Sequence, residues 1–225
     1  MADITGFVFD MDGVITDTAK YHYLAWKEAA QANFGVTITP AVNELLKGRS
    51  RMDSLDAIIT FAHQEGKYSQ AEKQRIATEK NQRYQTLIQS MTPADILPGM
   101  ADFLNLLDQK HYPLAVASAS FNAPFIIQQL HLQALLAKVV DPGTLKHGKP
   151  APDIFEAAAD LISSPYASTI GFEDAEAGVK GIKAAGMFAV GIGDAEILHE
   201  ADIVFSSTAE VDFDRIKKAF EAWRQ

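Results

Sequence analysis

Hydrophobic residues after residue 92 follow two alternating patterns. Short apolar runs typical of buried strands occur near 114–117, 138–140, 169–171, 188–191 and 203–205. Stretches with helical spacing separate most of them, near 100–109, 123–130, 153–161, 175–185 and 212–223. An earlier apolar run at 4–9 predicts a first strand. This alternation builds a parallel sheet covered on both faces, so we predict a doubly wound, mostly parallel, Rossmann-like α/β fold.

Residues 18–91 differ from the rest of the chain, because they have helical spacing almost throughout and no convincing strand. Apolar residues recur at helical intervals from Tyr21 to Ala32 and again from Leu55 to Ala62. Pro93 and Pro98 break helix where the strand pattern begins. We therefore predict an α/β core domain at 1–17 and 92–225 with an inserted α-helical cap domain at 18–91. A cap on two short linkers can move as a lid.

Two carboxylates follow the first predicted strand. Side chains two apart on extended backbone point the same way, so Asp10 and Asp12 face one volume, and Gly13 permits a sharp turn just beyond them. Ligands of open α/β sheets bind beyond the carboxyl ends of the strands, which is where this pair lies. Taken alone, an Asp-x-Asp-Gly segment is equally consistent with a structural turn.

Polar residues also follow other predicted strands. Ser118, Ala119 and Ser120 end one strand, Lys149 precedes a helix, and Glu173 with Asp174 ends another apolar run. Each has a plain structural alternative: Ser118 as a helix cap, Lys149 as a surface residue, and the acidic pair as an exposed helix start. Together with the Asp10 pair they supply a nucleophile, hydroxyl and amide hydrogen-bond donors for a phosphate, one cation and a second pair of carboxylates. This combination indicates phosphoryl transfer.

The chemistry of these residue types supports that interpretation. A carboxylate attacking a phosphate dianion is repelled by it, and a divalent cation held by the same carboxylates reduces the repulsion. Oxygen ligands favour Mg²⁺, with Glu173 and Asp174 helping to hold it. Asp10 would attack, and Asp12 suits proton transfer. Lys149 would offset charge on the phosphoryl oxygens, to which Ser118 would donate a hydrogen bond.

Composition excludes several classes of function. The chain has 225 residues, 48% of them hydrophobic, a net charge of -9 and no cysteine. It has no basic run to follow a nucleic-acid backbone, no thiolate chemistry and no apolar stretch long enough to cross a membrane. No basic segment with a long apolar core begins the chain. We expect a cytoplasmic monomer that binds small molecules, with no nucleic-acid or membrane partner.

The motifs, in their order and spacing, resemble the four motifs of the haloacid dehalogenase superfamily of phosphotransferases. They are Asp10-Met11-Asp12-Gly13-Val14, Ser118, Lys149 and Gly171-Phe172-Glu173-Asp174. Over essentially the whole length the chain also resembles the β-phosphoglucomutase family within it. The narrower match rests on Asp17-Thr18, His22, Trp26, Lys47-Gly48, Ser50-Arg51, Asp53-Ser54, Lys80-Asn81, Ser118-Ala119-Ser120 and Lys149-Pro150-Ala151-Pro152-Asp153-Ile154-Phe155.

The resemblance implies a role for each matching residue. Asp10 is the phosphorylated nucleophile, and Asp12 is the general acid and base, which also offers its backbone carbonyl to Mg²⁺. Thr18 lies at the hinge, and His22 orients Asp12 when the lid closes. The residues implied in holding the sugar and the second phosphate are Trp26, Gly48, Arg49, Ser50, Arg51, Ser54, Lys80, Ala119, Ser120 and Asn122. For Lys80, a stem that extends its ammonium into water is an equally good interpretation.

The family match includes two departures. Arg49 stands where a small apolar residue is expected, and Phe121 stands where a lysine is expected. Arg49 could replace the missing cation; otherwise the grip on the second phosphate is weaker.

The resemblance implies a mutase that interconverts β-D-glucose 1-phosphate and glucose 6-phosphate. It uses one Mg²⁺ per subunit, an aspartyl-phosphate enzyme, and glucose 1,6-bisphosphate as intermediate and activating primer. The alternatives are a sugar-phosphate phosphatase built on the same site and a non-catalytic sugar-phosphate sensor. Intact Asp10 and Asp12 argue against the sensor.

Overall fold

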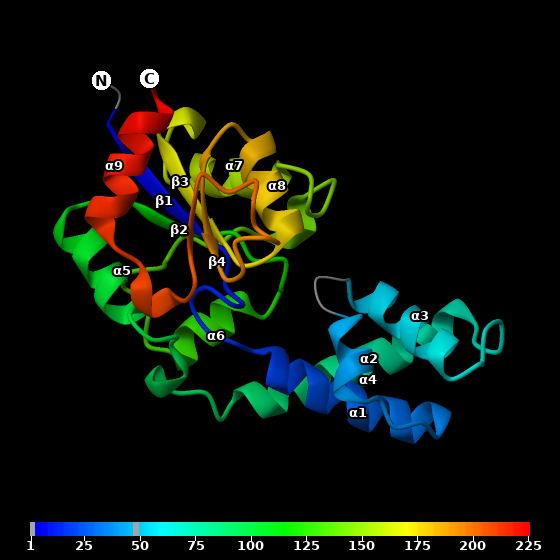
Figure 1. Cartoon of the computed structure of the whole chain (residues 1–225). Helices are drawn as coiled ribbons and strands as arrows, with labels where there is room; N and C mark the ends of the chain where they lie inside the picture. The colour runs from blue at the N-terminus through cyan, green and yellow to red at the C-terminus, as the bar shows by residue number, and fades with distance from the viewer. Residues whose placement is uncertain (1–2, 47–49) are drawn as a thin grey trace. The chain divides into compact units, whose positions relative to one another are not determined.

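The computed structural model describes residues 3–46 and 50–225 of the chain (Figure 1). Two compact units account for these residues. One is an α/β unit formed by Met1–Asp17 and Met91–Gln225, and the other is a helical unit formed by Thr18–Ser90. Each unit has its own hydrophobic core.

The α/β unit is built on a parallel five-stranded sheet. Its strands are β1 (Gly6–Phe9), β2 (Leu114–Val116), β3 (Thr169–Glu173), β4 (Phe188–Ile192) and β5 (Ile203–Phe205), in the order β2-β1-β3-β4-β5. All four pairings are parallel, and Phe9 of β1 is aligned with Val116 on one side and Phe172 on the other. The predicted doubly wound α/β fold is confirmed. Because β1 is central, the residue that follows it lies at the middle of the carboxyl edge.

Helices cover both faces of this sheet because β1 and its neighbours are apolar on both faces. Val8 packs with side chains of α7 (Asp153–Leu161) and α8 (Glu176–Ala184) in one buried cluster. Phe7 lies on the opposite face of the sheet. Its ring packs edge-to-face with Phe103 of α5 (Met100–Gln109) and at a tilted angle with Phe213 of α9 (Phe213–Trp223). Figure 1 shows α5 and α9 on one side of the strands and α7 and α8 on the other. The remaining short elements of the unit are α6 (Ala123–Gln129), η1 (Pro93–Asp95), η2 (Pro142–Thr144), η3 (Tyr166–Ser168) and η4 (Thr208–Glu210).

The helical unit consists of α1 (Ala19–Phe34), α2 (Pro40–Glu44), α3 (Arg51–Phe61) and α4 (Gln70–Ile88). Its core gathers apolar side chains from α1, α3 and α4, including Trp26, Leu55 and Ile76. Local sequence sets the helix ends: α1 stops at Gly35 in the left-handed region, and a Ser69–Glu72 capping box begins α4. In the described parts of the chain, no helix combines the length and the apolar character needed to cross a bilayer.

The predicted strand at 138–140 is wrong. Val139 makes only an isolated parallel bridge to Val116, held by hydrogen bonds from Val116 N–H to the Lys138 carbonyl and from Val140 N–H to the Val116 carbonyl. The partner strand β2 has three residues, and Pro142 starts a 3₁₀ turn almost at once, so the pairing cannot extend. Other boundaries shift by one or two residues, as at β1, which begins at Gly6 rather than at residue 4.

Candidate active site

Asp10 occupies the centre of the site because it follows β1 directly. Its backbone N–H still donates to the Phe172 carbonyl at 3.0 Å, so the residue is held in the sheet while its side chain, 8% exposed as a residue, lies at the carboxyl edge. The chain then turns, with Gly13 N–H donating to the Thr16 carbonyl at 2.8 Å. Asp12 is half-buried inside this turn and forms a bridge with Thr16.

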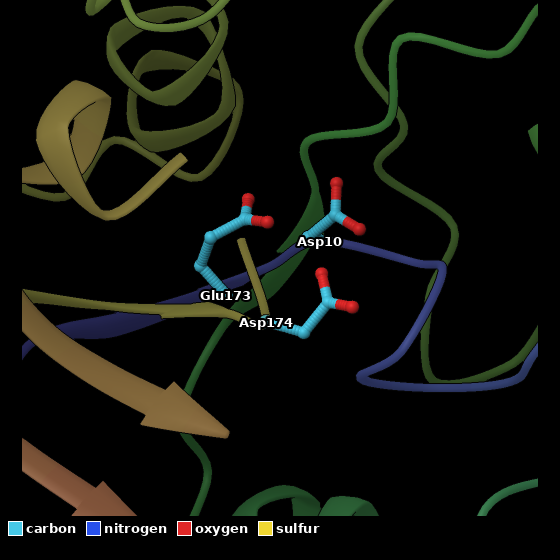
Figure 2. A group of neighbouring side chains, drawn as sticks. All are labelled: Asp10, Glu173 and Asp174. Carbon is cyan, nitrogen blue, oxygen red and sulfur yellow. The ribbon is translucent and has the colours of Figure 1, made fainter. Parts of the chain in front are cut away.

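Three carboxylates converge at this edge (Figure 2). Oxygen atoms of Asp10, Glu173 and Asp174 all lie within 4.8 Å of one another. The sheet register causes this: Phe9 is aligned with Phe172, so the next residues, Asp10 and Glu173, end neighbouring strands side by side. The donor set consists of oxygen atoms alone, which suits a hard divalent cation such as Mg²⁺. Such an ion would also offset the repulsion among three clustered anions.

Two glycines make room for these carboxylates. A Cβ at Gly13, whose φ is +76°, would lie 2.0 Å from Asp174 Oδ2, and a Cβ at Gly178 would lie 2.0 Å from the Glu173 Cδ. Neither approach is compatible with any larger residue unless the acid moves. Gly13 was predicted as a turn residue, whereas Gly178 was missed. Its one available signal was its position in a helix, where glycine costs about 1 kcal/mol relative to alanine and so suggests a packing requirement.

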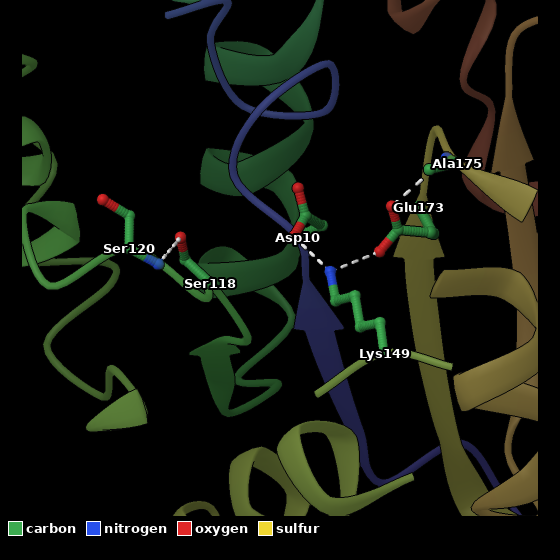
Figure 3. A network of polar contacts seen from close by, with 6 residues as sticks. All are labelled: Asp10, Ser118, Ser120, Lys149, Glu173 and Ala175. Atoms are coloured by element: carbon green, nitrogen blue, oxygen red, sulfur yellow. Dashed lines mark hydrogen bonds and ion pairs between the residues drawn. The ribbon is translucent and has the colours of Figure 1, made fainter. Parts of the chain in front are cut away.

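Lys149 links two members of the acidic cluster (Figure 3). Its Nζ lies 2.5 Å from Asp10 Oδ1 and 2.6 Å from Glu173 Oε2, and its side chain is 17% exposed. Burial opposes its charge, but the carboxylates of Asp10 and Glu173 outweigh burial and hold the pKa of Lys149 above its usual range. The surface-residue interpretation of Lys149 is therefore excluded. A fixed ammonium next to Asp10 is well placed to bind a phosphoryl oxygen.

Burial raises the pKa of the neighbouring acids Glu173 and Asp174, whereas it lowers the pKa of a lysine. Burial, together with the charge of Asp10, raises the pKa of Glu173 to about 8, and the same two causes raise the pKa of Asp174 to about 6. Glu173 is 2% exposed as a residue and also accepts a hydrogen bond from Ala175 N–H at 3.2 Å. Both shifts come from conditions that disfavour additional negative charge at this edge, and a bound divalent cation would offset them.

The loop after β2 supplies the predicted hydroxyl and amide groups. Ser118 and Asn122 are buried, Ser120 is half-buried and Ala119 is exposed. Ser120 N–H donates to Ser118 Oγ at 3.2 Å, as Figure 3 shows, and Asn122 N–H donates to Ser120 Oγ at 3.2 Å. Ser118 does not cap α6, whose N-cap residue is Asn122. Phe121 is 65% exposed in the same loop.

Lys80 is buried in the helical unit, at only 3% exposure, so the alternative of an ammonium extended into water is wrong. Its Nζ lies 2.8 Å from His22 Nδ1, 4.7 Å from the ring centroid of Trp26 and 5.0 Å from that of Tyr84. The His22 ring stacks on Tyr84, with centroids 4.0 Å apart. Trp26, assigned to substrate binding by the resemblance, is thus also a core residue of this unit.

Burial shifts both members of this pair towards the neutral form. It lowers the pKa of His22 to about 3, with help from the charges of Lys80 and Arg51. Burial likewise lowers the pKa of Lys80 to about 7, with a smaller contribution from Arg51. His22 is therefore neutral near pH 7 and can accept a hydrogen bond from Lys80, whose amine is close to its midpoint.

The other predicted residues of the helical unit lie near the starts of α1 and α3. Thr18 is fully buried as the N-cap residue of α1. Ser50 caps α3 by accepting from Asp53 N–H at 3.2 Å, Arg51 is the first helical residue and Ser54 is buried one turn later. Gly48 and Arg49 lie outside the described residues. That Arg49 replaces the cation missing at Phe121 therefore stays a prediction.

Comparison with known proteins identifies the family. A family model described as a haloacid dehalogenase-like hydrolase matches residues 4–186. β-Phosphoglucomutase from Bacillus subtilis strain 168 is 43% identical over 217 residues, which cover 96% of each chain. The chain belongs to the β-phosphoglucomutase family of haloacid dehalogenase-like hydrolases. This confirms the resemblance inferred from the motifs.

One solved structure and one phosphatase relative are also similar to this chain. The crystal structure of β-phosphoglucomutase from Clostridium difficile matches with a TM-score of 0.92 at 40% identity, over 98% of this chain and 99% of the other. (DL)-Glycerol-3-phosphatase 2 from Arabidopsis thaliana is 31% identical over 223 residues, which cover 93% of this chain and 89% of that one. The chain is thus similar both to proteins named as mutases and to a protein named as a phosphatase.

Proposed function

We propose that this chain is a Mg²⁺-dependent phosphomutase that interconverts β-D-glucose 1-phosphate and glucose 6-phosphate. The observation that carries the proposal is the group formed by Asp10, Lys149, Glu173 and Asp174, which has the charges and distances that phosphoryl transfer to a carboxylate needs. The 43% identity to a β-phosphoglucomutase over nearly the whole chain supports this choice of substrate.

Asp10 is the proposed nucleophile. One of its carboxylate oxygens forms a bond to phosphorus while the bond from phosphorus to the departing sugar oxygen breaks, which gives an aspartyl phosphate. Lys149 lies 2.5 Å from this carboxylate and would bind the transferring phosphoryl oxygens as their charge shifts. Ser118, buried in the adjacent loop, would donate a hydrogen bond to the same oxygens.

The metal ligands would be the side chains of Asp10, Glu173 and Asp174 with the backbone carbonyl of Asp12. When bound, Mg²⁺ would neutralise negative charge on the phosphoryl group that Asp10 attacks. The clustering of these three carboxylates, two of them with raised pKa values, supports the choice of Asp10, Glu173 and Asp174 as ligands.

Asp12 is the proposed general acid and base. It would donate a proton to the departing sugar oxygen and later remove one from the attacking hydroxyl, so that each transfer balances. Thr18 lies at the start of the helical unit, where a hinge is proposed, and His22 would orient Asp12. The neutral state of His22 suits an acceptor or a single donor in that role.

The remaining proposed residues bind the sugar and the phosphate that is not transferred. Arg51 and Lys80 are the cations of this set, and Ser120 and Asn122 are the neutral donors. Sugar contacts are proposed for Trp26, Gly48, Ser50, Ser54 and Ala119, and Arg49 would supply the cation that is missing at Phe121. The phosphorylated Asp10 would donate its phosphoryl group to a hydroxyl of a sugar monophosphate, which gives glucose 1,6-bisphosphate; this intermediate would reorient and return its other phosphate to Asp10. The same compound would prime the enzyme.

A sugar-phosphate phosphatase is the second candidate. (DL)-Glycerol-3-phosphatase 2 aligns with this chain over 89% of its own length. In addition, Phe121 stands where a lysine is expected in the loop that would hold the second phosphate. In a phosphatase, water would discharge the aspartyl phosphate. A lid that excludes water distinguishes the mutase, because it preserves the phosphoenzyme until a second sugar hydroxyl attacks. A monomer in the cytoplasm completes the proposal.

Phosphorylation of Asp10 tests the proposal directly. With Mg²⁺, β-glucose 1-phosphate and a trace of glucose 1,6-bisphosphate as primer, the wild type should form glucose 6-phosphate, whereas the α-anomer should not react. Asp10→Asn should abolish phosphoenzyme formation, and Asp12→Asn should greatly slow transfer to and from the sugar with the fold intact by circular dichroism. Normal sugar turnover by either variant would refute the assigned roles.

A further inference from the structure

The segment from His147 to Asp153 delivers Lys149 to the site. The two salt bridges of Lys149 reach out of this segment to Asp10 and Glu173, which belong to two different strand ends. The segment itself has no regular structure before α7 begins at Asp153, apart from a turn in which Ala151 N–H donates to the Gly148 carbonyl at 3.0 Å. Something other than a helix or a strand must therefore hold the amine in position.

Asp153 joins the two ends of this segment. Its Oδ1 accepts a hydrogen bond from the backbone N–H of His147 at 3.2 Å and lies 3.1 Å from His147 Nδ1, which donates when it carries the proton. Asp153 is the first residue of α7, where the helix dipole favours the negative charge of its carboxylate. A single side chain thus closes a loop of seven residues with Lys149 at its third position.

The middle of the loop lies close to residues of α7 and α8. Lys149 Nζ lies 5.0 Å from the ring centroid of Phe155, which is fully buried in α7. The Ala151 carbonyl would lie 3.2 Å from a Cβ at Gly181 of α8, so the absence of a side chain there allows the loop to sit close to that helix. These contacts support the middle of the loop, whereas Asp153 holds its His147 end.

We propose that Asp153, with His147 as its partner, is a positioning residue that holds the Lys149 ammonium against Asp10. The inference rests on the proposed function of Asp10 and Lys149. Asp153 acts through the loop, since its hydrogen bonds go to His147 and not to Asp10 or Glu173. Displacement of a catalytic cation by about 1 Å can cost as much as about 100-fold in rate, so a loose loop should slow the phosphorylation step.

Rapid-quench measurement of Asp10 phosphorylation tests this role. Acetyl phosphate serves as donor in the presence of Mg²⁺, so the readout does not depend on which sugar is bound. Asp153→Ala should lower the maximal rate constant about 10-fold and change the half-saturating donor concentration less than about 2-fold. Asp153→Asn should recover most of the rate, because its amide oxygen still accepts from His147 N–H. Asp160→Ala is the matched control on the same helix, since Asp160 is exposed and accepts a hydrogen bond from the Tyr166 hydroxyl, away from the loop.

A double-mutant cycle separates positioning from general stability. In a Lys149→Met background, Asp153→Ala should have less than about 2-fold further effect, since the group it positions is gone. An equal proportional loss in both backgrounds, or no loss in the Lys149-containing enzyme, overturns the proposal. If Asp153→Ala does not fold, His147→Ala takes its place with an expected loss of about 3-fold; its side chain is 71% exposed, and the backbone donor to Asp153 remains.

A labelling experiment keeps this inference separate from the proposed function. Acetic anhydride modification of Lys149 is followed by mass spectrometry, with the exposed Lys138 as internal reference. Acetylation of Lys149 should be several-fold faster in Asp153→Ala than in wild type or Asp160→Ala. Failure of the wild type to phosphorylate Asp10 would overturn the proposed function alone, whereas unchanged labelling in Asp153→Ala would overturn the positioning role.

Discussion

Lys80 and His22 form a buried hydrogen-bonded pair in the helical unit, with 2.8 Å between Nζ and Nδ1. The two residues are 58 positions apart in the chain and meet because α1 and α4 pack side by side. Aromatic rings of Trp26 and Tyr84 enclose the amine, which favours its charge, but burial outweighs this effect and lowers its pKa to about 7. The unit therefore carries a group that titrates within the working pH range of most enzymes.

The stability of the helical unit should depend on pH through Lys80. Its pKa is about 7 when folded and near 10.5 when unfolded, so between these values the unfolded chain binds more protons. The free energy of unfolding should therefore rise with pH above about 7, by at most about 1.4 kcal/mol per pH unit. Lys80→Met should remove this rise. Chemical denaturation of both proteins between pH 6 and pH 9 measures the difference.

Lys67→Met is the control for this experiment, because Lys67 is an exposed lysine of the same unit. Its denaturation midpoints should follow the wild type across the range. Parallel curves for wild type and Lys80→Met would show that the amine keeps an ordinary pKa and that burial does not govern it.

The acidic cluster should bind Mg²⁺ more tightly as pH rises. Protons compete with the metal at Glu173, whose pKa is raised to about 8, and at Asp174, whose pKa is raised to about 6, so affinity should increase from pH 6 to pH 8. Glu173→Gln should weaken binding at least about 10-fold and flatten this pH dependence. Calorimetric titration with Mg²⁺ at three pH values measures both effects.

Glu176→Gln provides the matched control, since Glu176 is exposed at the start of α8 and pairs with Lys180. Its Mg²⁺ affinity should equal that of the wild type. Unchanged affinity in Glu173→Gln would remove Glu173 from the metal site.

Gly178 should be required for the position of Glu173. A Cβ at this residue would lie 2.0 Å from Glu173 Cδ, so Gly178→Ala must displace the buried carboxylate. We expect a loss of about 1–3 kcal/mol in the free energy of unfolding, typical of overpacking, together with weaker Mg²⁺ binding. Ala177→Ser, at the exposed neighbouring position, should change neither quantity. Wild-type metal affinity in Gly178→Ala would mean that Glu173 moves freely or does not bind the ion.

The sequence predicted that Asp10 and Glu173 lie close together, because periodicity locates strand ends. Asp10 and Glu173 both follow apolar runs, and a parallel sheet brings such ends to one edge, so their proximity needed no knowledge of side-chain packing. The same reasoning gave most helices to within one or two residues. It failed at 138–140, where Val139 and Val140 give an apolar pattern but the pairing cannot extend into a strand before the turn at Pro142.

Burial of polar groups could not be predicted in the same way. Helical spacing placed Lys80 on an apolar stripe, yet an amine there can extend to water or turn inward, and only the positions of Trp26 and Tyr84 decide between the two. The contact of His147 with Asp153 is similar, since both residues are common on exposed loops. Such features depend on the meeting of separate elements in three dimensions, which periodicity does not describe.

The fate of the phosphoryl group tests the central claim most directly. Purified protein is incubated with Mg²⁺, β-glucose 1-phosphate and a trace of glucose 1,6-bisphosphate, and glucose 6-phosphate and free phosphate are recorded in the same reaction, with the α-anomer as control. A mutase predicts glucose 6-phosphate many turnovers ahead of free phosphate, and from the β-anomer only. Free phosphate as the main product would contradict this account and identify a phosphatase.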